Sequence, residues 1–257
     1  MAKVDILNYI SDSNILRSTY DTDTNELDIT DVPQNLNSVI TLGGGSPGNT
    51  KYEELLDIIA DNYTGIWEND DIIVNKHLTL GASQNVTEVI LPNMTSVPGN
   101  FLYNNNHVTR IYMPKLIEAP MASFGYLANA NLNALAFQSL KTIGDQSFRN
   151  GKFSKFDMLG ASDGTIGGSS FIQNSNLNVL VIRADSVTPL SNINAFNSTP
   201  FASGGAGGTI YVPSAQISSY QAASNWSTIL GYANNSIQAI EGSIYENEYA
   251  DGTPIGG

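Results

Sequence analysis

Acidic residues between Asp21 and Asp28 alternate with other residues, as the oxygen ligands of a calcium-binding loop do. Such a loop has glycine at its sixth position and glutamate at its twelfth, where this sequence has Glu26 and Val32. We therefore predict a solvated acidic turn and no metal site, with weak calcium binding as the alternative.

A glycine-rich segment, residues 43–48, follows a possible strand at 38–42 and precedes a predicted helix. Its spacing is similar to that of a phosphate-binding loop. However, Asn49 stands where that loop has the lysine that contacts the β- and γ-phosphates. A turn before a helix explains the same residues, so we predict no nucleotide and no other cofactor.

Histidines and carboxylates, which could also support catalysis, are scattered along the chain. His77 and His107 have no cysteine and no closely spaced second histidine beside them, so a metal site or a catalytic triad would need long-range placement. The candidate carboxylates fall singly in different repeats, without the close pair that glycoside cleavage requires. They are Glu88, Glu118, Asp145, Asp157, Asp163 and Asp185. We predict that the protein is not an enzyme.

The charge of the chain argues against nucleic acid as a partner. The net charge is −13, whereas phosphate binding needs clustered cations. Arg149, Lys152 and Lys155 form the one basic cluster, which we interpret as solvated surface, with an anion-binding patch as the alternative. No stretch approaches the roughly 18 apolar residues of a membrane span, and the first residues show no signal peptide.

An apolar pattern, with apolar residues at the first, fourth and sixth positions, recurs five times at intervals of 22, 24, 21 and 24 residues. Its last two apolar positions share one face of a short strand, and stacked strands would pool those faces into one core. The strand residues are Val86, Val89, Leu91; Val108, Ile111, Met113; Leu132, Leu135, Phe137; Phe153, Phe156, Met158; and Leu177, Leu180, Ile182.

Each unit also carries a phenylalanine 10 to 14 residues after its last strand residue. Four of these follow an apolar residue and a Pro or Gly, which we interpret as a turn that sends the ring into the far side of the core. The phenylalanines are Phe101, Phe124, Phe148, Phe171 and Phe196.

Residues 86–240 resemble the leucine-rich repeats of the BspA-like family. The resemblance rests on the segments 89–92, 111–114, 141–148, 209–213 and 220–226. It implies an α/β leucine-rich-repeat solenoid of short parallel strands with a mostly irregular convex side, capped at both ends. It also implies bacterial surface adhesion or a part of a phage particle or tail.

Four regions are expected along the chain. Residues 1–71 would form an acidic cap or docking module with one helix near 51–63, and residues 72–208 the repeats. Residues 209–242 would form a C-terminal cap, with a short helix carrying Ile217, Tyr220 and Trp226 and a final strand at 236–240. Residues 243–257 are acidic and turn-rich, so we expect a loose tail.

The last two apolar residues of each unit are here called the strand anchors. The residues beside these anchors define a candidate binding face. They form two columns across the strands, and four apolar members would make a strip on the open side. The strip consists of Ile90, Tyr112, Ala136 and Val181, with the cations Arg110 and Lys155 beside it. Another subunit or residues 1–71 could cover it instead.

We therefore expect a non-enzymatic binding or structural protein that presents its repeats to a protein or surface glycan. It would act outside the cell, at a cell surface or on a virion, and could form oligomers through the sheet face or the N-terminal module. A β-helical enzyme that cleaves polysaccharide, like a phage tailspike, and an intracellular scaffold are the alternatives.

Overall fold

The computed structural model describes residues 94–255 in full and, before them, five strands. Three of these form an antiparallel sheet in the order β1 (Lys3–Ser11), β2 (Asn14–Asp21) and β3 (Glu26–Asp31). This sheet was not predicted. In it Asp21 pairs with Glu26 across a hairpin, so Glu26 and Asp28 belong to an extended strand. The helix expected near 51–63, the glycine-rich segment and His77 lie outside the described residues.

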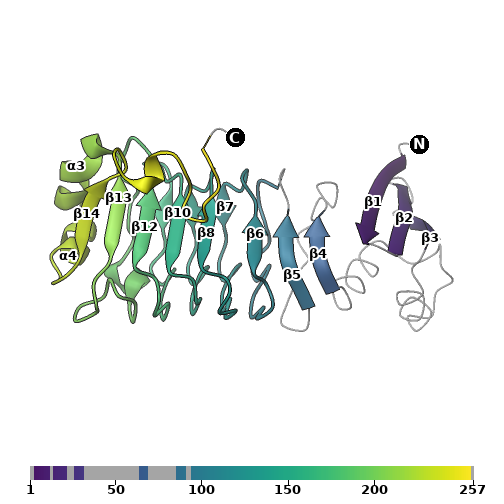
Figure 1. Cartoon of the computed structure of the whole chain (residues 1–257), viewed down its shortest axis with the longest axis horizontal. Coiled ribbons are helices and arrows are strands. Elements are labelled where there is room, and N and C mark those ends of the chain that lie inside the picture. The colour runs from purple at the N-terminus through teal and green to yellow at the C-terminus, as the bar shows by residue number, and fades with distance from the viewer. Residues whose placement is uncertain are drawn as a thin grey trace.

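Short parallel strands form the main architecture (Figure 1). One sheet has the order β4 (Thr64–Glu68), β5 (Asn85–Ile90), β6 (Arg110–Tyr112). The next has the order β14 (Ser236–Ala239), β13 (Thr209–Val212), β12 (Val179–Ile182), β10 (Lys155–Met158), β8 (Ala134–Phe137). Because β4 pairs with β5, the parallel strands begin before residue 72, where the repeats were expected to start.

The strand register places equivalent anchors side by side. Val89 pairs with Ile111, and Leu135, Phe156 and Leu180 pair in succession across β8, β10 and β12. All of these side chains are buried. The periodic pattern therefore identified the core face of the described strands correctly.

A second, smaller sheet lies where proline and glycine had been interpreted only as turns. Its strands are two residues long, in the order β11 (Thr165–Ile166), β9 (Thr142–Ile143), β7 (Glu118–Ala119). Gly144 and Gly167 follow two of these strands, and a Cβ on either would lie 2.8 and 2.9 Å from the backbone of the neighbouring unit. Glycine is needed there because adjacent units approach so closely.

Gly144→Ala is expected to lower the free energy of unfolding by about 1–3 kcal/mol, because the added methyl group must push neighbouring backbone aside. Gly168→Ala is the matched control, since its Cβ would meet nothing closer than 3.5 Å. Urea unfolding of both variants measures the difference. Equal stability of the two variants would contradict the close approach of the units.

The predicted phenylalanines form one continuous row in the core. Phe101, Phe124, Phe148, Phe171 and Phe196 are all fully buried, with successive ring centroids 6.0, 5.2, 5.7 and 5.5 Å apart. This confirms the prediction that the rings close the far side of the core. Buried serines precede three of the rings; the Ser147 and Ser170 hydroxyls, for example, donate to the carbonyls of Gly144 and Gly167.

Two helices cover the C-terminal end of the core, where one was expected. They are α3 (Ile217–Ala222), entered through the 3-10 turn η2 (Ser214–Gln216), and α4 (Trp226–Leu230). Tyr220 and Trp226 lie on different helices, and both bind the backbone of Thr188: the Thr188 N–H donates to the Tyr220 hydroxyl and the Trp226 indole donates to the Thr188 carbonyl. Another 3-10 turn, η1 (Ile193–Phe196), holds the last phenylalanine of the row. Among the described residues no helix is long and apolar enough to cross a membrane.

Residues 241–255, here called the C-terminal segment, run back over the face of the sheet (Figure 1). The segment contains the 3-10 turn η3 (Ile244–Glu246) and buries Tyr245 and Ala250. The expectation of a loose tail from residue 243 is therefore wrong for the described residues. The tail carries few apolar side chains, but its backbone finds specific partners on the sheet.

Candidate binding site

The structure divides the predicted binding strip into an open part and a covered part. Ala136 and Val181 are 7% and 0% exposed, and Val181 packs with Ile240, Tyr245 and Ala250. A partner cannot reach Val181 while the C-terminal segment is in place, and Ala136 is itself buried. The open apolar strip is thus wrong at Val181, which residues of the C-terminal segment cover. Tyr112 is half-buried, and Ile90 pairs with it in register.

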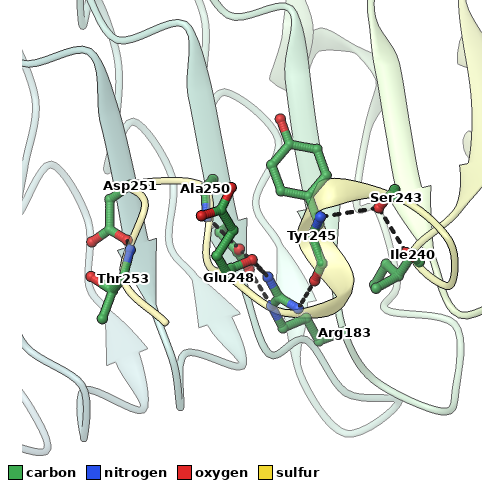
Figure 2. Close-up of polar contacts among 9 residues, drawn as sticks. Arg183, Ile240, Ser243, Tyr245, Glu248, Ala250, Asp251 and Thr253 are labelled. Carbon is green, nitrogen blue, oxygen red and sulfur yellow. Dashed lines mark hydrogen bonds and ion pairs between the residues drawn. The ribbon is translucent and has the colours of Figure 1, made fainter. Parts of the chain in front are cut away.

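A buried ion pair between Asp157 and Arg183 anchors the C-terminal segment to the sheet. Figure 2 shows Arg183 with Tyr245 and Glu248 of the segment. Arg183 donates to both carboxylate oxygens of Asp157, at 2.8 and 2.6 Å. The same guanidinium donates to the carbonyls of Tyr245 and Glu248, at 2.8 and 3.0 Å. The backbone N–H of Ala250 completes the arrangement by donating to Asp157 at 2.9 Å. The pair therefore joins two repeats and the segment through five hydrogen bonds.

Asp157 is an unusual carboxylate because its side chain is only 1% exposed. Burial raises its pKa, and the opposing effects of Arg183 and of the Ala250 N–H do not cancel that rise. A carboxylate held in this way has its oxygens occupied by donors. It is suited to fixing the segment and not to exchanging protons with a substrate.

The two predicted cations lie on either side of a small residue. Lys155 pairs in register with Ala134 of β8, and Arg110 begins β6, which lies beside β8 although the two strands belong to separate hydrogen-bonded sheets. Between them is a hollow of about 650 Å³, here called the Arg110–Lys155 pocket. Asn131 and Asn133 line one side, and residues 250–254 of the C-terminal segment form the opposite wall.

The basic cluster of the sequence does not form one patch. Arg149 lies over the ring of Tyr126, 5.3 Å from its centroid, and donates to Gln146 and Gln173. Lys152 lines a second hollow of about 580 Å³, together with Asn176 and Asn178. Lys155 lines the Arg110–Lys155 pocket, which shares only Asn133 with the hollow of Lys152, so the three cations do not converge on one patch.

The other candidate residues for chemistry remain apart. His107 is exposed, and its backbone N–H donates to the side-chain oxygen of Asn105. Glu118, Asp163 and Asp185 are exposed, and Asp145 accepts a hydrogen bond from Ser169. In the part of the chain that the structure describes, no group of three or more His, Cys, Asp or Glu side chains could hold a metal ion.

Comparison with known proteins gives one distant structural likeness. No family model matches the sequence, and no curated protein matches it. Among solved structures, the chain is similar to a leucine-rich repeat protein from Bacteroides ovatus ATCC 8483, with 10% sequence identity and a TM-score of 0.32. The match covers 81% of this chain and 60% of that protein.

Proposed function

We propose that this protein is a non-catalytic binding protein whose stacked repeats, of the BspA-like kind, hold the Arg110–Lys155 pocket for a partner molecule. One observation carries the proposal: the pocket exists in the free chain, with strands on one side and a firmly anchored segment on the other. A site that is already formed binds at a lower entropic cost than one that must be ordered first.

The setting that we propose is a bacterial surface or a virus particle. The surface chemistry supports this setting, because only 14% of the residues are charged and asparagine, serine and threonine supply much of the remaining polarity. Such groups form hydrogen bonds with glycans and proteins without strong long-range attraction. If the protein also self-associates through its sheet face, the contact would have to avoid the part that the C-terminal segment covers.

The alternative, a β-helical enzyme that cleaves polysaccharide, would use two carboxylates flanking the scissile bond. The buried carboxylate on the sheet face, Asp157, is paired with Arg183 and lies under the C-terminal segment. The geometry of this face therefore supports binding better than cleavage.

Ala134→Tyr tests the proposal by filling the floor of the pocket with a side chain that strands accept well. We expect the full-length variant to lose at least tenfold in binding to whole bacterial cells and to arrays of glycans and surface proteins, because the ring would occupy the space between Arg110 and Lys155. Ala222→Tyr adds the same bulk at an exposed position on α3 and should bind as the unaltered protein does. Equal binding by both variants would show that the pocket is not the binding surface.

A further inference from the structure

Two cations line the Arg110–Lys155 pocket, which makes it suitable for an anionic group on a small molecule. Arg110 and Lys155 flank the β8 position occupied by Ala134, one on each side. Lys155 pairs with Ala134 on the neighbouring strand, which puts these two backbone positions about 4.8 Å apart. Arg110 lies on β6, which contacts β8 without a hydrogen-bonded ladder between them. Ala134 is a small residue, and both cations line the same hollow with it, so both contribute positive charge to that hollow.

The remaining lining offers neutral hydrogen-bonding groups. Asn131 and Asn133 are exposed, and each side-chain amide can both donate and accept. Thr253 adds a hydroxyl group from the C-terminal segment. Alternating donors and acceptors of this kind match the hydroxyl groups of a sugar.

The wall of the Arg110–Lys155 pocket that residues 250–254 form has a defined shape. Asp251 accepts a hydrogen bond from the backbone of Thr253 at 3.0 Å, and Glu248 bridges to Pro254, so the end of the segment folds back on itself. Asp251 also places one carboxylate in the lining, opposite the two cations. It can accept hydrogen bonds from hydroxyl groups, whereas it would repel a ligand that is anionic along its whole length.

We infer that the Arg110–Lys155 pocket binds a saccharide that bears a carboxylate, with the carboxylate between Arg110 and Lys155 and the hydroxyl groups on the asparagines and the segment. The inference rests on the proposed function and names the ligand class of the same site. A hollow of about 650 Å³ lies within the range of small-molecule sites and accommodates a few sugar rings.

An acidic peptide suits the pocket less well than a sugar. Peptide recognition depends on buried apolar anchors, but the apolar part of this lining consists of Ala134, Ala250, the edge of Pro254 and Ile111, which is itself buried. The amide and hydroxyl groups of the lining favour a polyhydroxylated ring.

Calorimetric titration of the full-length protein tests the inference with four kinds of probe: galacturonic acid and sialyllactose, the methyl esters of both, neutral lactose, and a hexaglutamate peptide. We expect a carboxylated sugar to bind and its methyl ester to bind at least tenfold more weakly, because esterification removes the charge. Raising the sodium chloride concentration from 50 to 500 mM should weaken binding of the carboxylated sugar.

Lys155→Ala provides the residue-level test. It should weaken binding of the carboxylated sugar by about tenfold to a hundredfold, since a hydrogen bond to a charged group is lost. Lys152→Ala removes the same charge three positions away, in a hollow that adjoins the pocket at Asn133 but includes neither Arg110 nor Lys155. The affinity of this variant should stay within twofold of the unaltered protein's. Both side chains lie at the surface, and circular dichroism and thermal unfolding of each variant check that the fold is kept.

Three results would overturn the inference: no binding of either carboxylated sugar, equal binding of the methyl esters, or an equal loss with Lys152→Ala. Tighter binding of the peptide, lost with Lys155→Ala, would also replace the sugar by a different ligand class. None of these results decides the proposed function, which depends on whether Ala134→Tyr lowers binding to cells and arrays.

Discussion

Arg183→Ala is expected to lower the free energy of unfolding by about 3–5 kcal/mol at pH 8, because it leaves the Asp157 carboxylate buried without a counter-charge. The variant also removes the donor that holds the carbonyls of Tyr245 and Glu248. The C-terminal segment should then detach more often. Chymotrypsin should cleave it at Tyr245 or Tyr249 faster than in the unaltered protein.

Arg183→Ala should lower the free energy of unfolding by less at pH 4 than at pH 8. Removing Arg183 takes away an effect that lowers the pKa of Asp157, so this pKa rises further above its ordinary value of 3.8. Below the raised pKa the carboxyl group is neutral in the folded variant, and the cost of burying a charge disappears. Urea unfolding at both pH values measures the change. An equal loss at pH 4 and pH 8 would contradict the charge-based explanation.

Lys141→Ala is the control for the ion pair. Lys141 lies 3.8 Å from Asp163, and both side chains are well exposed. Exposed pairs of this kind contribute about 0–1 kcal/mol. If Lys141→Ala lowers the free energy of unfolding as much as Arg183→Ala does, the burial of the Asp157–Arg183 pair does not explain its contribution to stability.

Phe148→Ala is expected to cost about 3–5 kcal/mol, the range for removing a fully buried aromatic side chain. Phe148 stacks on Phe124 and Phe171, at 5.2 and 5.7 Å, and meets the edge of Phe156 at 4.7 Å. Its loss therefore opens a cavity that spans three successive units and interrupts the row of rings.

Phe148→Leu serves as the comparison, because leucine fills part of the cavity and should recover a substantial part of the loss. Thermal and urea unfolding of the two variants give the values. If Phe148→Ala lowers the free energy of unfolding by less than about 1 kcal/mol, the row of rings does not stabilise the core, since such a small loss is typical of surface positions.

The sequence pattern predicted the anchors and the phenylalanine row because both repeat at nearly the same spacing as the strands that they stabilise. The pairs Ser147–Phe148 and Ser170–Phe171 were a further signal that could have been used, since each serine hydroxyl binds the turn just before its ring. The strands β7, β9 and β11 were missed because two residues are too few to show a period of two.

The C-terminal segment was predicted incorrectly for a different physical reason. Its position depends on hydrogen bonds to Asp157 and Arg183, which belong to other repeats and lie more than 60 residues away in the sequence. Local composition cannot show such contacts. The one available signal was Asp157 itself, a charged residue within a column of otherwise uncharged residues on the sheet face.

The single charge in that column, Asp157, determines which repeat the C-terminal segment binds. Tyr112, Ala136 and Val181 occupy the equivalent positions in other units, and none of them offers a carboxylate to the Ala250 N–H or to the guanidinium. If the segment were displaced by one unit, its backbone donor would face an uncharged side chain, and the Asp157–Arg183 pair would lose its partners in the segment. Although the repeats resemble one another, the C-terminal segment therefore binds at one position along the sheet.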